Sequence, residues 1–199
     1  EPPVRGRYKK NTTLVPPIVR DSILEAEKRS RPGPHVLVYQ TSTSDTTLLD
    51  QLERIREREF IVYGLRRSAR RGNCTLKEFS EAGFVEDLAN ARAVVCNGGL
   101  SLIGEALYLG KPVFSVPVAN QYEQILNARY LDHLGYGLDA PRIDADLLRL
   151  FLAETPKYAA RVAKHRQKGN QELYEIVDRV LERFARRGKK EREEARAQR

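Results

Sequence analysis

The hydrophobic positions of this chain form short continuous runs, separated by longer segments in which apolar residues recur every three or four positions. Continuous apolar runs are typical of strands buried on both faces, and the longer spacing is typical of amphipathic helices. We predict strands at residues 36–39, 60–64, 74–79, 93–96, 112–117 and 135–138. Because strands alternate with helices, we expect an α/β fold: a doubly wound, parallel, Rossmann-like sheet in a three-layer α/β/α single domain.

Helical periodicity and proline content set the expected boundaries. The spacing predicts helices at residues 20–29, 48–55, 85–88, 100–109, 120–134, 144–152 and 156–184, with a break near Gly169. Residues 1–34 contain six prolines, which indicates an interdomain linker and a short helix. Residues 35–187 form the expected folded domain, and 188–199 a charged C-terminal tail that we expect to fray. The run Arg66–Arg71 is interpreted as a basic loop with a short strand after it.

The stretch 93–107 carries the strongest functional signal. A buried strand leads into Gly98-Gly99 and directly into a helix, an arrangement that presents backbone N–H groups to phosphate. Asn97 and Ser101 add neutral hydrogen-bond donors. Glu105 follows Ser101 by one turn, about 6 Å along the helix axis, which suits a ribose diol beside a diphosphate. The alternative is an ordinary strand–turn–helix with Glu105 exposed or paired with an arginine.

A second polar cluster, residues 119–128, follows the strand at 112–117. Its amides and its carboxylate suit sugar hydroxyls, and the alternative is capping by Asn120 with Gln121 and Glu123 solvated. Ligands of doubly wound sheets bind at the carboxyl ends of the strands. We therefore expect the two clusters to face one cleft.

Composition excludes several classes of protein. The 199 residues are 41% hydrophobic and 31% charged, as in a soluble globular domain, and no apolar run approaches membrane-spanning length. The chain begins at Glu1, lacks Met and shows no secretory signal, so we expect a piece of a longer cytoplasmic polypeptide. Cys74 and Cys96 do not suggest a disulfide framework, and Cys96 is interpreted as a core residue in a reducing compartment.

The net charge of +8 lies mainly at the two ends of the chain and in the run Arg66–Arg71. Without a continuous patch or a motif, this distribution does not predict a nucleic-acid partner, and it fits an anionic membrane face as well. His35, His133 and His165 are scattered and are interpreted as structural or solvated. No catalytic triad, Walker sequence or metal-spaced Cys/His group is present, so we expect no catalytic residue, no metal and no cofactor in this chain.

Five segments, taken in order, resemble the donor half of GT-B glycosyltransferases, similar to the glycosyltransferase family 28 C-terminal and lipid II GlcNAc transferase-like group. They are Phe84-Val85-Glu86-Asp87-Leu88-Ala89, residues 97–107, Gly110-Lys111-Pro112-Val113, Pro117, and Glu123-Gln124-Ile125-Leu126-Asn127-Ala128. Val15-Pro16-Pro17-Ile18 also resembles the connector that leads into the second domain of these enzymes.

The resemblance implies a UDP-sugar as substrate, with UDP-GlcNAc the candidate, and a metal-independent transfer. The site residues that it implies are Asn97, Gly98, Gly99, Ser101, Ser42 and Thr43 for the diphosphate, Glu105 for the ribose, Phe84 and Val85 for the base, and Glu123, Gln124 and Asn127 for the donor sugar. The chain departs from the pattern twice. Asn97 replaces a His or Arg, and hydroxyls replace the glycines of a phosphate turn at residues 40–44.

We therefore predict the nucleotide-sugar-binding domain of an inverting glycosyltransferase, inactive alone because the base comes from an N-terminal acceptor-binding domain. The acceptor is expected to be lipid-linked or at a membrane surface, which would place the protein peripherally at the inner membrane face. Two alternatives remain: a UDP-sugar 2-epimerase or hydrolase of the same fold, and a non-catalytic nucleotide-sugar-binding subunit that works with a separate acceptor-binding protein.

Overall fold

The computed structural model describes residues 12–13, 15–40, 47–164 and 167–197, with side chains up to residue 186. Seven strands of this part of the chain form one sheet in the order β3-β4-β2-β1-β5-β6-β7. Their bounds are β1 His35–Tyr39, β2 Glu59–Tyr63, β3 Ala69–Arg71, β4 Cys74–Leu76, β5 Ala93–Cys96, β6 Val113–Ser115 and β7 Gly137–Asp139. The predicted Rossmann-like α/β fold is confirmed.

The sheet is parallel except at one edge, where β3 pairs antiparallel with β4. From β1 the chain builds outward through β2 and β4, and it then returns to the other side of β1 to build β5, β6 and β7. The connectivity therefore reverses between β1 and β5, whose registered pairs include Tyr39 with Cys96. Sheets of this kind bind ligands outside the carboxyl ends of the strands at such a switch point.

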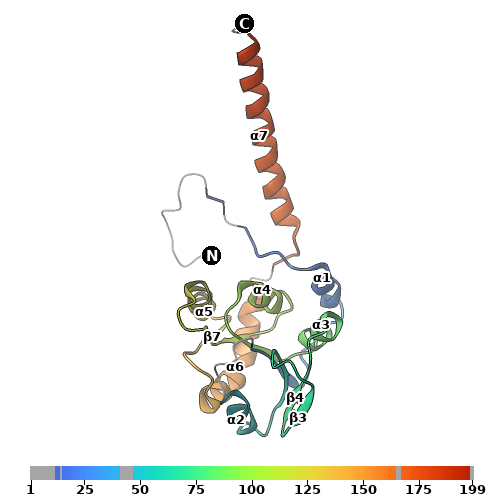
Figure 1. The fold of residues 1–199 in the computed structure, drawn as a ribbon, viewed down its shortest axis with the longest axis vertical. Helices are drawn as coiled ribbons and strands as arrows, with labels where there is room; N and C mark the ends of the chain where they lie inside the picture. The colour runs from blue at the N-terminus through green and yellow to red at the C-terminus, as the bar shows by residue number, and fades with distance from the viewer. Residues whose placement is uncertain (1–11, 14, 41–46, 165–166, 198–199) are drawn as a thin grey trace.

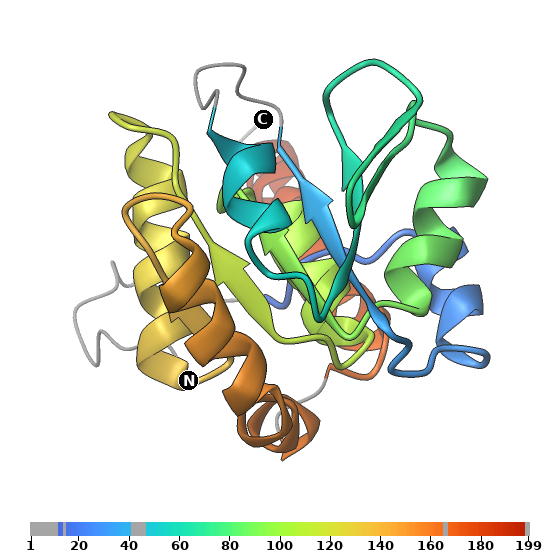
Figure 2. The ribbon, with the colours of Figure 1, turned by 90° about the horizontal axis from the view of Figure 1, so that it is seen from below.

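Helices cover both faces of the sheet, as the three-layer prediction requires (Figure 2). On one face of the sheet, α2 and α6 pack against buried strand side chains such as those of Val36 and Val38. On the other face, α1, α3 and α4 pack against Leu37, because successive strand side chains point to opposite sides. The helix bounds are α1 Asp21–Glu27, α2 Leu48–Glu53, α3 Glu81–Ala89, α4 Leu100–Tyr108, α5 Tyr122–Leu134, α6 Ala145–Lys164 and α7 Gln171–Ala197.

Two local predictions between residues 66 and 88 are wrong. Arg70 and Arg71 belong to β3 rather than to a loop, and Arg71 binds Asp50 and Glu53 at 2.6 and 2.8 Å. Gly83 lies inside the first turn of α3 rather than in a turn before it, because the helix begins after Ser80. The Ser80 hydroxyl accepts a hydrogen bond from the Gly83 N–H at 3.3 Å, as helix N-cap residues do.

The predicted interruption of the sixth helix before Pro156 is also wrong, since α6 runs through this proline. A proline inside a helix removes the N–H that would bond to the carbonyl four residues earlier. Here that carbonyl belongs to Leu152, and it accepts a hydrogen bond from the Thr155 hydroxyl at 2.8 Å instead. The predicted break near Gly169 is confirmed, with φ of +70° at this glycine.

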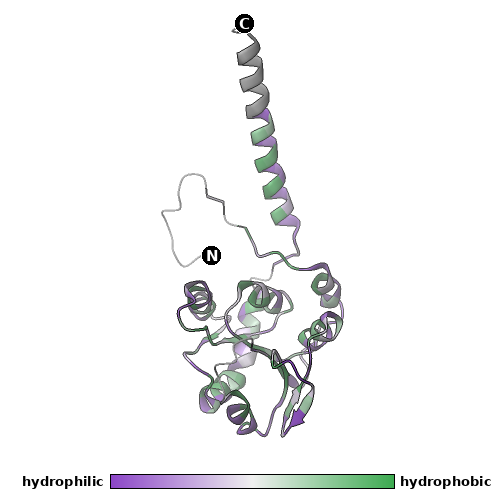
Figure 3. Cartoon of the chain, in the orientation of Figure 1, coloured by the Kyte–Doolittle hydropathy of each residue, from purple (hydrophilic) through white to green (hydrophobic). Residues whose placement is uncertain are grey.

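The last helix, α7, projects away from the α/β body (Figure 1). It continues to Ala197, and fraying beyond Gly188 stays a prediction. Apolar and charged positions alternate along it (Figure 3), and Tyr174, Val177, Leu181 and Phe184 are exposed. Among the described helices, none is long and apolar enough to cross a bilayer.

Candidate functional site

Two cavities open at the carboxyl edge of the sheet. The first, which we call the aromatic cavity, has a volume of about 390 Å³. The second, the sheet-end cavity, has a volume of about 740 Å³. Tyr39 lines the aromatic cavity and Gln40, the next residue, lines the sheet-end cavity. Because consecutive residues of an extended chain point to opposite faces, β1 contributes to both.

The aromatic cavity brings together three of the predicted site residues, Phe84, Ser101 and Glu105. Ser101 and Glu105 reach it from the same face of α4, as their spacing of four predicts. The other lining residues are Ile18, Arg20, Tyr39, Phe79 and Leu102. An apolar wall with a few polar groups at one end is typical of a small-molecule site.

Aromatic rings form the wall of this cavity. The ring of Phe84, 4% exposed, lies 5.4 Å from Tyr39, 5.2 Å from Tyr63 and 5.5 Å from Phe79. Phe79 is 57% exposed at the rim. Val85, predicted beside Phe84 as a base-binding residue, is buried in the core of that face of the sheet. The wall is therefore built from Phe84, Tyr39 and Phe79.

Glu105 does not stand alone in its apolar helix. Both of its carboxylate oxygens accept hydrogen bonds from Arg20, Oε1 from Nε at 2.6 Å and Oε2 from Nη2 at 2.9 Å. The hydrogen bond to Glu105 is the main cause that raises the pKa of the Arg20 guanidinium. A bidentate arginine is the partner that a buried carboxylate requires. The sequence alternative in which Glu105 pairs with an arginine is thus what the structure shows.

The Gly98-Gly99 turn joins β5 to α4 with two different glycines. Gly98 has φ of +90°, and a Cβ there would lie 2.9 Å from the Gln124 carbonyl oxygen. Gly99 has φ of −65°, and a Cβ there would meet nothing within 4 Å. Gly98 therefore serves the fold, while Gly99 leaves the start of α4 open. The N–H groups of a helix start favour an anion.

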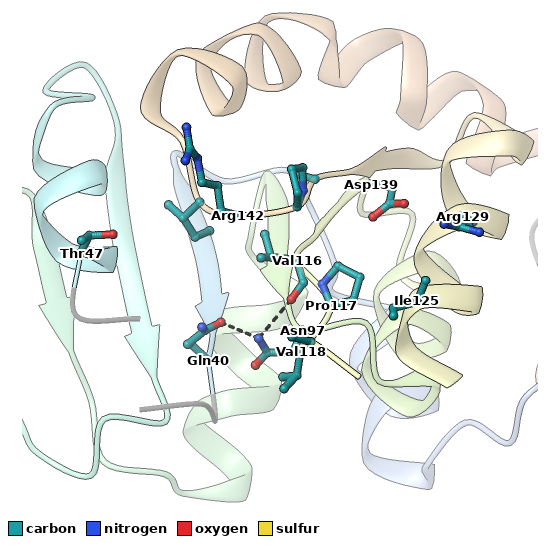
Figure 4. Close-up of a pocket in the computed structure, with 14 residues that line it drawn as sticks. Gln40, Thr47, Asn97, Val116, Pro117, Val118, Ile125, Arg129, Asp139 and Arg142 are labelled. Atoms are coloured by element: carbon teal, nitrogen blue, oxygen red, sulfur yellow. Dashed lines mark hydrogen bonds between the residues drawn. The ribbon is translucent and has the colours of Figure 1, made fainter. Parts of the chain in front are cut away.

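Asn97 lies at the switch point and turns its amide inward (Figure 4). Its Nδ2 donates to Gln40 Oε1 at 2.7 Å and to the Val116 carbonyl oxygen at 3.2 Å, and both amide side chains are buried. This bond joins the carboxyl ends of β1 and β5. Ser42 and Thr43, the other residues predicted near the diphosphate, lie outside the described residues.

The second predicted cluster lies at the start of α5 and touches the glycine turn. Asn127 Nδ2 donates to the Gly98 carbonyl oxygen at 3.0 Å. Gln124 Oε1 accepts from the Val118 N–H at 3.0 Å, while Glu123 is exposed. Asn120 does not cap the helix, because the cap position belongs to Gln121. The cluster at residues 119–128 therefore lies next to the glycine turn of the stretch 93–107, as expected if both face one cleft.

Charged residues that the sequence patterns did not single out line the sheet-end cavity: Arg129, Asp139 and Arg142. Figure 4 shows Arg129 and Asp139 side by side across the cavity from Arg142. Burial, followed by the charge of Asp132, raises the pKa of the Asp139 carboxyl, and Arg129 acts against this rise. The position of Asp139 at the end of a predicted strand is a signal that could have identified it as a site residue. No sequence pattern indicates that Arg20 pairs with Glu105, which lies 85 residues away.

The predictions for the two cysteines and for His35 agree with the structure. Cys74 and Cys96 are free and buried, and burial raises the pKa of each thiol to about 11. Nε2 of His35 lies 2.9 Å from the Asp87 carbonyl oxygen, a structural contact, whereas His165 is outside the described residues. Among the described side chains, no group of three or more His, Cys, Asp or Glu residues could hold a metal ion.

The strand order, the helices on both faces of the sheet and the reversal of connectivity between β1 and β5 define a Rossmann-like α/β domain. Comparison with known families is more specific. Residues 2–156 match glycosyl transferase family 1, and the chain belongs to this family.

Solved structures with the same fold are glycosyltransferases. The spinosyn forosaminyltransferase SpnP is 19% identical, with a TM-score of 0.58 over 84% of this chain and 48% of that one. The glycosyltransferase of kitacinnamycin is 18% identical, with a TM-score of 0.56 over 87% of this chain and 47% of that one. The chain thus spans about half the length of these proteins.

A third match is the spinosyn rhamnosyltransferase SpnG complexed with thymidine diphosphate, 18% identical, with a TM-score of 0.53 over 68% of this chain and 41% of that one. Among curated proteins, no relative was found. At these identities the structural likeness shows the fold alone, that of one Rossmann-like domain of GT-B glycosyltransferases, and the expected family 28, lipid II-like subgroup is not confirmed.

Proposed function

We propose that the chain is the donor-binding half of a glycosyltransferase and that its ligand is a UDP-sugar, with UDP-GlcNAc the candidate. The observation that carries the proposal is the aromatic cavity, where Phe84, Ser101 and Glu105 meet beside the open start of α4. Three groups that the sequence patterns singled out separately thus line one cavity of about 390 Å³. A nucleoside needs this combination of an aromatic wall and hydroxyl acceptors.

Each part of the nucleotide has an assigned place in this proposal. The base lies against Phe84 and Phe79, and the ribose hydroxyls donate to Glu105. The diphosphate lies at the start of α4, where Gly99 leaves room and Ser101 is exposed. Backbone N–H groups at a helix start, together with the helix dipole, stabilise the negative charge there.

The sugar would lie toward α5 and the sheet-end cavity, within reach of Glu123, Gln124 and Asn127. Asn127 already donates to the Gly98 carbonyl oxygen and Gln124 accepts from the Val118 N–H, so a sugar would contact the outer parts of these side chains. Positive charge, which Asn97 does not supply, is available from Arg129 and Arg142 in the same cavity. These arginines are our candidates for balancing a leaving diphosphate.

The proposed reaction is a direct displacement without a metal. An acceptor hydroxyl oxygen forms a bond to the anomeric carbon, the bond from that carbon to the diphosphate oxygen breaks, and a base takes the hydroxyl proton. We assign the base and the acceptor site to an N-terminal domain, so this chain alone should bind a donor and transfer nothing. A lipid-linked acceptor at a membrane surface is the candidate suggested by the basic ends of the chain.

Calorimetry on the 199-residue chain tests the donor assignment. UDP should bind with millimolar affinity or better, and UDP-GlcNAc should add a contribution from the sugar. Thymidine diphosphate is the necessary comparison, because a relative was solved with this nucleotide. Thymidine diphosphate lacks the 2′-hydroxyl and should bind more weakly than UDP if the Glu105 carboxylate accepts hydrogen bonds from both hydroxyls of a ribose.

Glu105→Gln should weaken UDP binding about tenfold, the order expected when a hydrogen bond to a charged group is lost. Glu86→Gln is the matched control, since Glu86 is exposed on α3 and pairs with Arg29 at 3.3 Å away from the cavity. Absence of any UDP heat at millimolar concentration, or equal affinities in wild type and Glu105→Gln, would overturn the proposal.

A further inference from the structure

Arg20 covers the carboxylate that we assign to the ribose. Its guanidinium bonds to both oxygens of Glu105, and its Nη1 also reaches Glu81 Oε1 at 3.1 Å. The side chain of Glu105 is 6% exposed, whereas those of Arg20 and Glu81 are 41% and 61% exposed. The buried carboxylate therefore lies behind a guanidinium that solvent can reach.

Arg20 follows a backbone segment that is held firmly in place. The Val19 N–H donates to Asn170 Oδ1 at 3.0 Å, and the Val19 carbonyl oxygen accepts from Asn170 Nδ2 at 2.7 Å. Val19 and Asn170 are both buried. A displacement of the guanidinium is therefore a change of side-chain rotamer, and Glu81 offers it an exposed partner throughout.

We propose that Arg20 is a displaceable cap on Glu105, which a ribonucleotide must move aside before its ribose hydroxyls can bond to the carboxylate. This inference rests on the proposed function, because it takes Glu105 as the ribose acceptor. Two N–H groups of the guanidinium fork leave the carboxylate, and the two hydroxyls of a 2′,3′-diol replace them. A 2′-deoxyribose brings one hydroxyl and replaces only half of the fork.

A cap on Glu105 lowers the apparent affinity of the protein for UDP. When only the uncapped fraction of the protein can accept the diol, the apparent affinity falls by that fraction. Removal of the cap should then strengthen UDP binding, and it should strengthen 2′-deoxy-UDP binding less, because fewer hydroxyls gain from the freed carboxylate. Arg20 thus determines specificity as well as affinity.

The test is calorimetry with UDP and 2′-deoxy-UDP on the full chain, as wild type, Arg20→Gln and Arg20→Lys. Arg20→Gln should bind UDP at least about fivefold more tightly, and its preference for UDP over 2′-deoxy-UDP should rise. Arg20→Lys keeps the charge without the fork and should lie between the two. Arg29→Gln, which removes an exposed arginine from the Glu86 pair, should behave as wild type.

The outcomes separate the cap from other roles of Arg20. Loss of affinity for both nucleotides by one factor would indicate a purely structural ion pair, and a lower preference for UDP would indicate that Arg20 positions Glu105. Either result overturns the cap, as does an unchanged affinity. If the wild type binds no nucleotide, the proposed function is overturned and the cap with it, whereas UDP binding by the wild type together with any of the results above overturns the cap alone.

A measurement on the wild type removes dependence on the stability of the variants. The Arg20 Nε–H, assigned by triple-resonance NMR, should carry the shift of a hydrogen bond to a carboxylate in the free protein. Saturating UDP should abolish this shift, and 2′-deoxy-UDP should change it less. An Nε–H resonance that stays in place at UDP saturation contradicts the displacement.

Discussion

The aromatic cavity and the sheet-end cavity share an edge of the sheet but differ in how their carboxyl groups are compensated. In the aromatic cavity the buried carboxylate of Glu105 has both oxygens bonded to Arg20. In the sheet-end cavity burial raises the pKa of the Asp139 carboxyl, and the charge of Arg129 acts against this rise. The carboxylate of Glu105 is thus compensated by a bidentate arginine, whereas that of Asp139 is compensated only in part.

The largest expected effect comes from truncating the aromatic wall, which tests how firmly this side of the molecule is packed. Phe84→Ala should lower the free energy of unfolding by about 3 to 5 kcal/mol, because a buried ring is lost and a void remains. Tyr122→Ala, at an 83% exposed position on α5, should change it by less than about 0.5 kcal/mol. Urea unfolding of both variants measures the difference. Similar losses at the two positions would show that the sugar end is packed as firmly as the wall.

The two glycines of the turn should separate stability from binding. Gly98→Ala should cost about 1 to 3 kcal/mol, because the left-handed backbone disfavours a Cβ and the Gln124 carbonyl oxygen lies in its way. Gly99→Ala should leave the melting temperature unchanged and weaken binding of UDP, since its Cβ projects toward the open start of α4. Thermal unfolding and UDP titration decide this, and a destabilised Gly99→Ala would contradict it.

Among the residues assigned to the sugar, we expect Gln124 to contribute to stability and Glu123 to contribute to binding, with smaller effects than those of Gly98 and Gly99. Gln124→Ala leaves the Val118 N–H without its side-chain acceptor and should cost about 1 kcal/mol. Glu123→Gln removes an exposed charge and should leave stability unchanged. If Glu123 contacts the sugar, its substitution should lower the affinity ratio of UDP-GlcNAc to UDP. An unchanged ratio would remove Glu123 from the site.

Much of the fold follows from the sequence, because the central strands β1, β2, β5 and β6 lie in continuous apolar runs. β5 is matched residue for residue, and the other main-sheet strands within a few residues. The misses have local causes. The helix α6 survives Pro156 because one threonine hydroxyl replaces the missing N–H, a contact that periodicity cannot show. β3 consists of exposed residues at a sheet edge and therefore has no apolar signal.

The candidate site could be predicted where local spacing determines it. Ser101 and Glu105 share a helix face in any α4, and the glycine turn is read from neighbouring residues. Arg20 and Phe79 could not be predicted, because their proximity to Glu105 and Phe84 depends on how α1 and the segment before α3 pack on the sheet. Cavity chemistry is thus set by tertiary packing, even where the motif itself is local.

The smallest effect concerns Asp139, whose ionisation should oppose folding. Its pKa is raised in the folded protein, so the unfolded chain ionises first and stability is lost as the pH rises through the folded pKa. Asp139→Asn should therefore stabilise the protein by about 0.5 kcal/mol at pH 7, and this gain should vanish below pH of about 4. Asp146→Asn, which removes an exposed partner of Arg149, should give no such gain. Urea unfolding at the two pH values measures both, and a destabilised Asp139→Asn at pH 7 would mean that Arg129 already compensates this carboxylate as fully as Arg20 compensates Glu105.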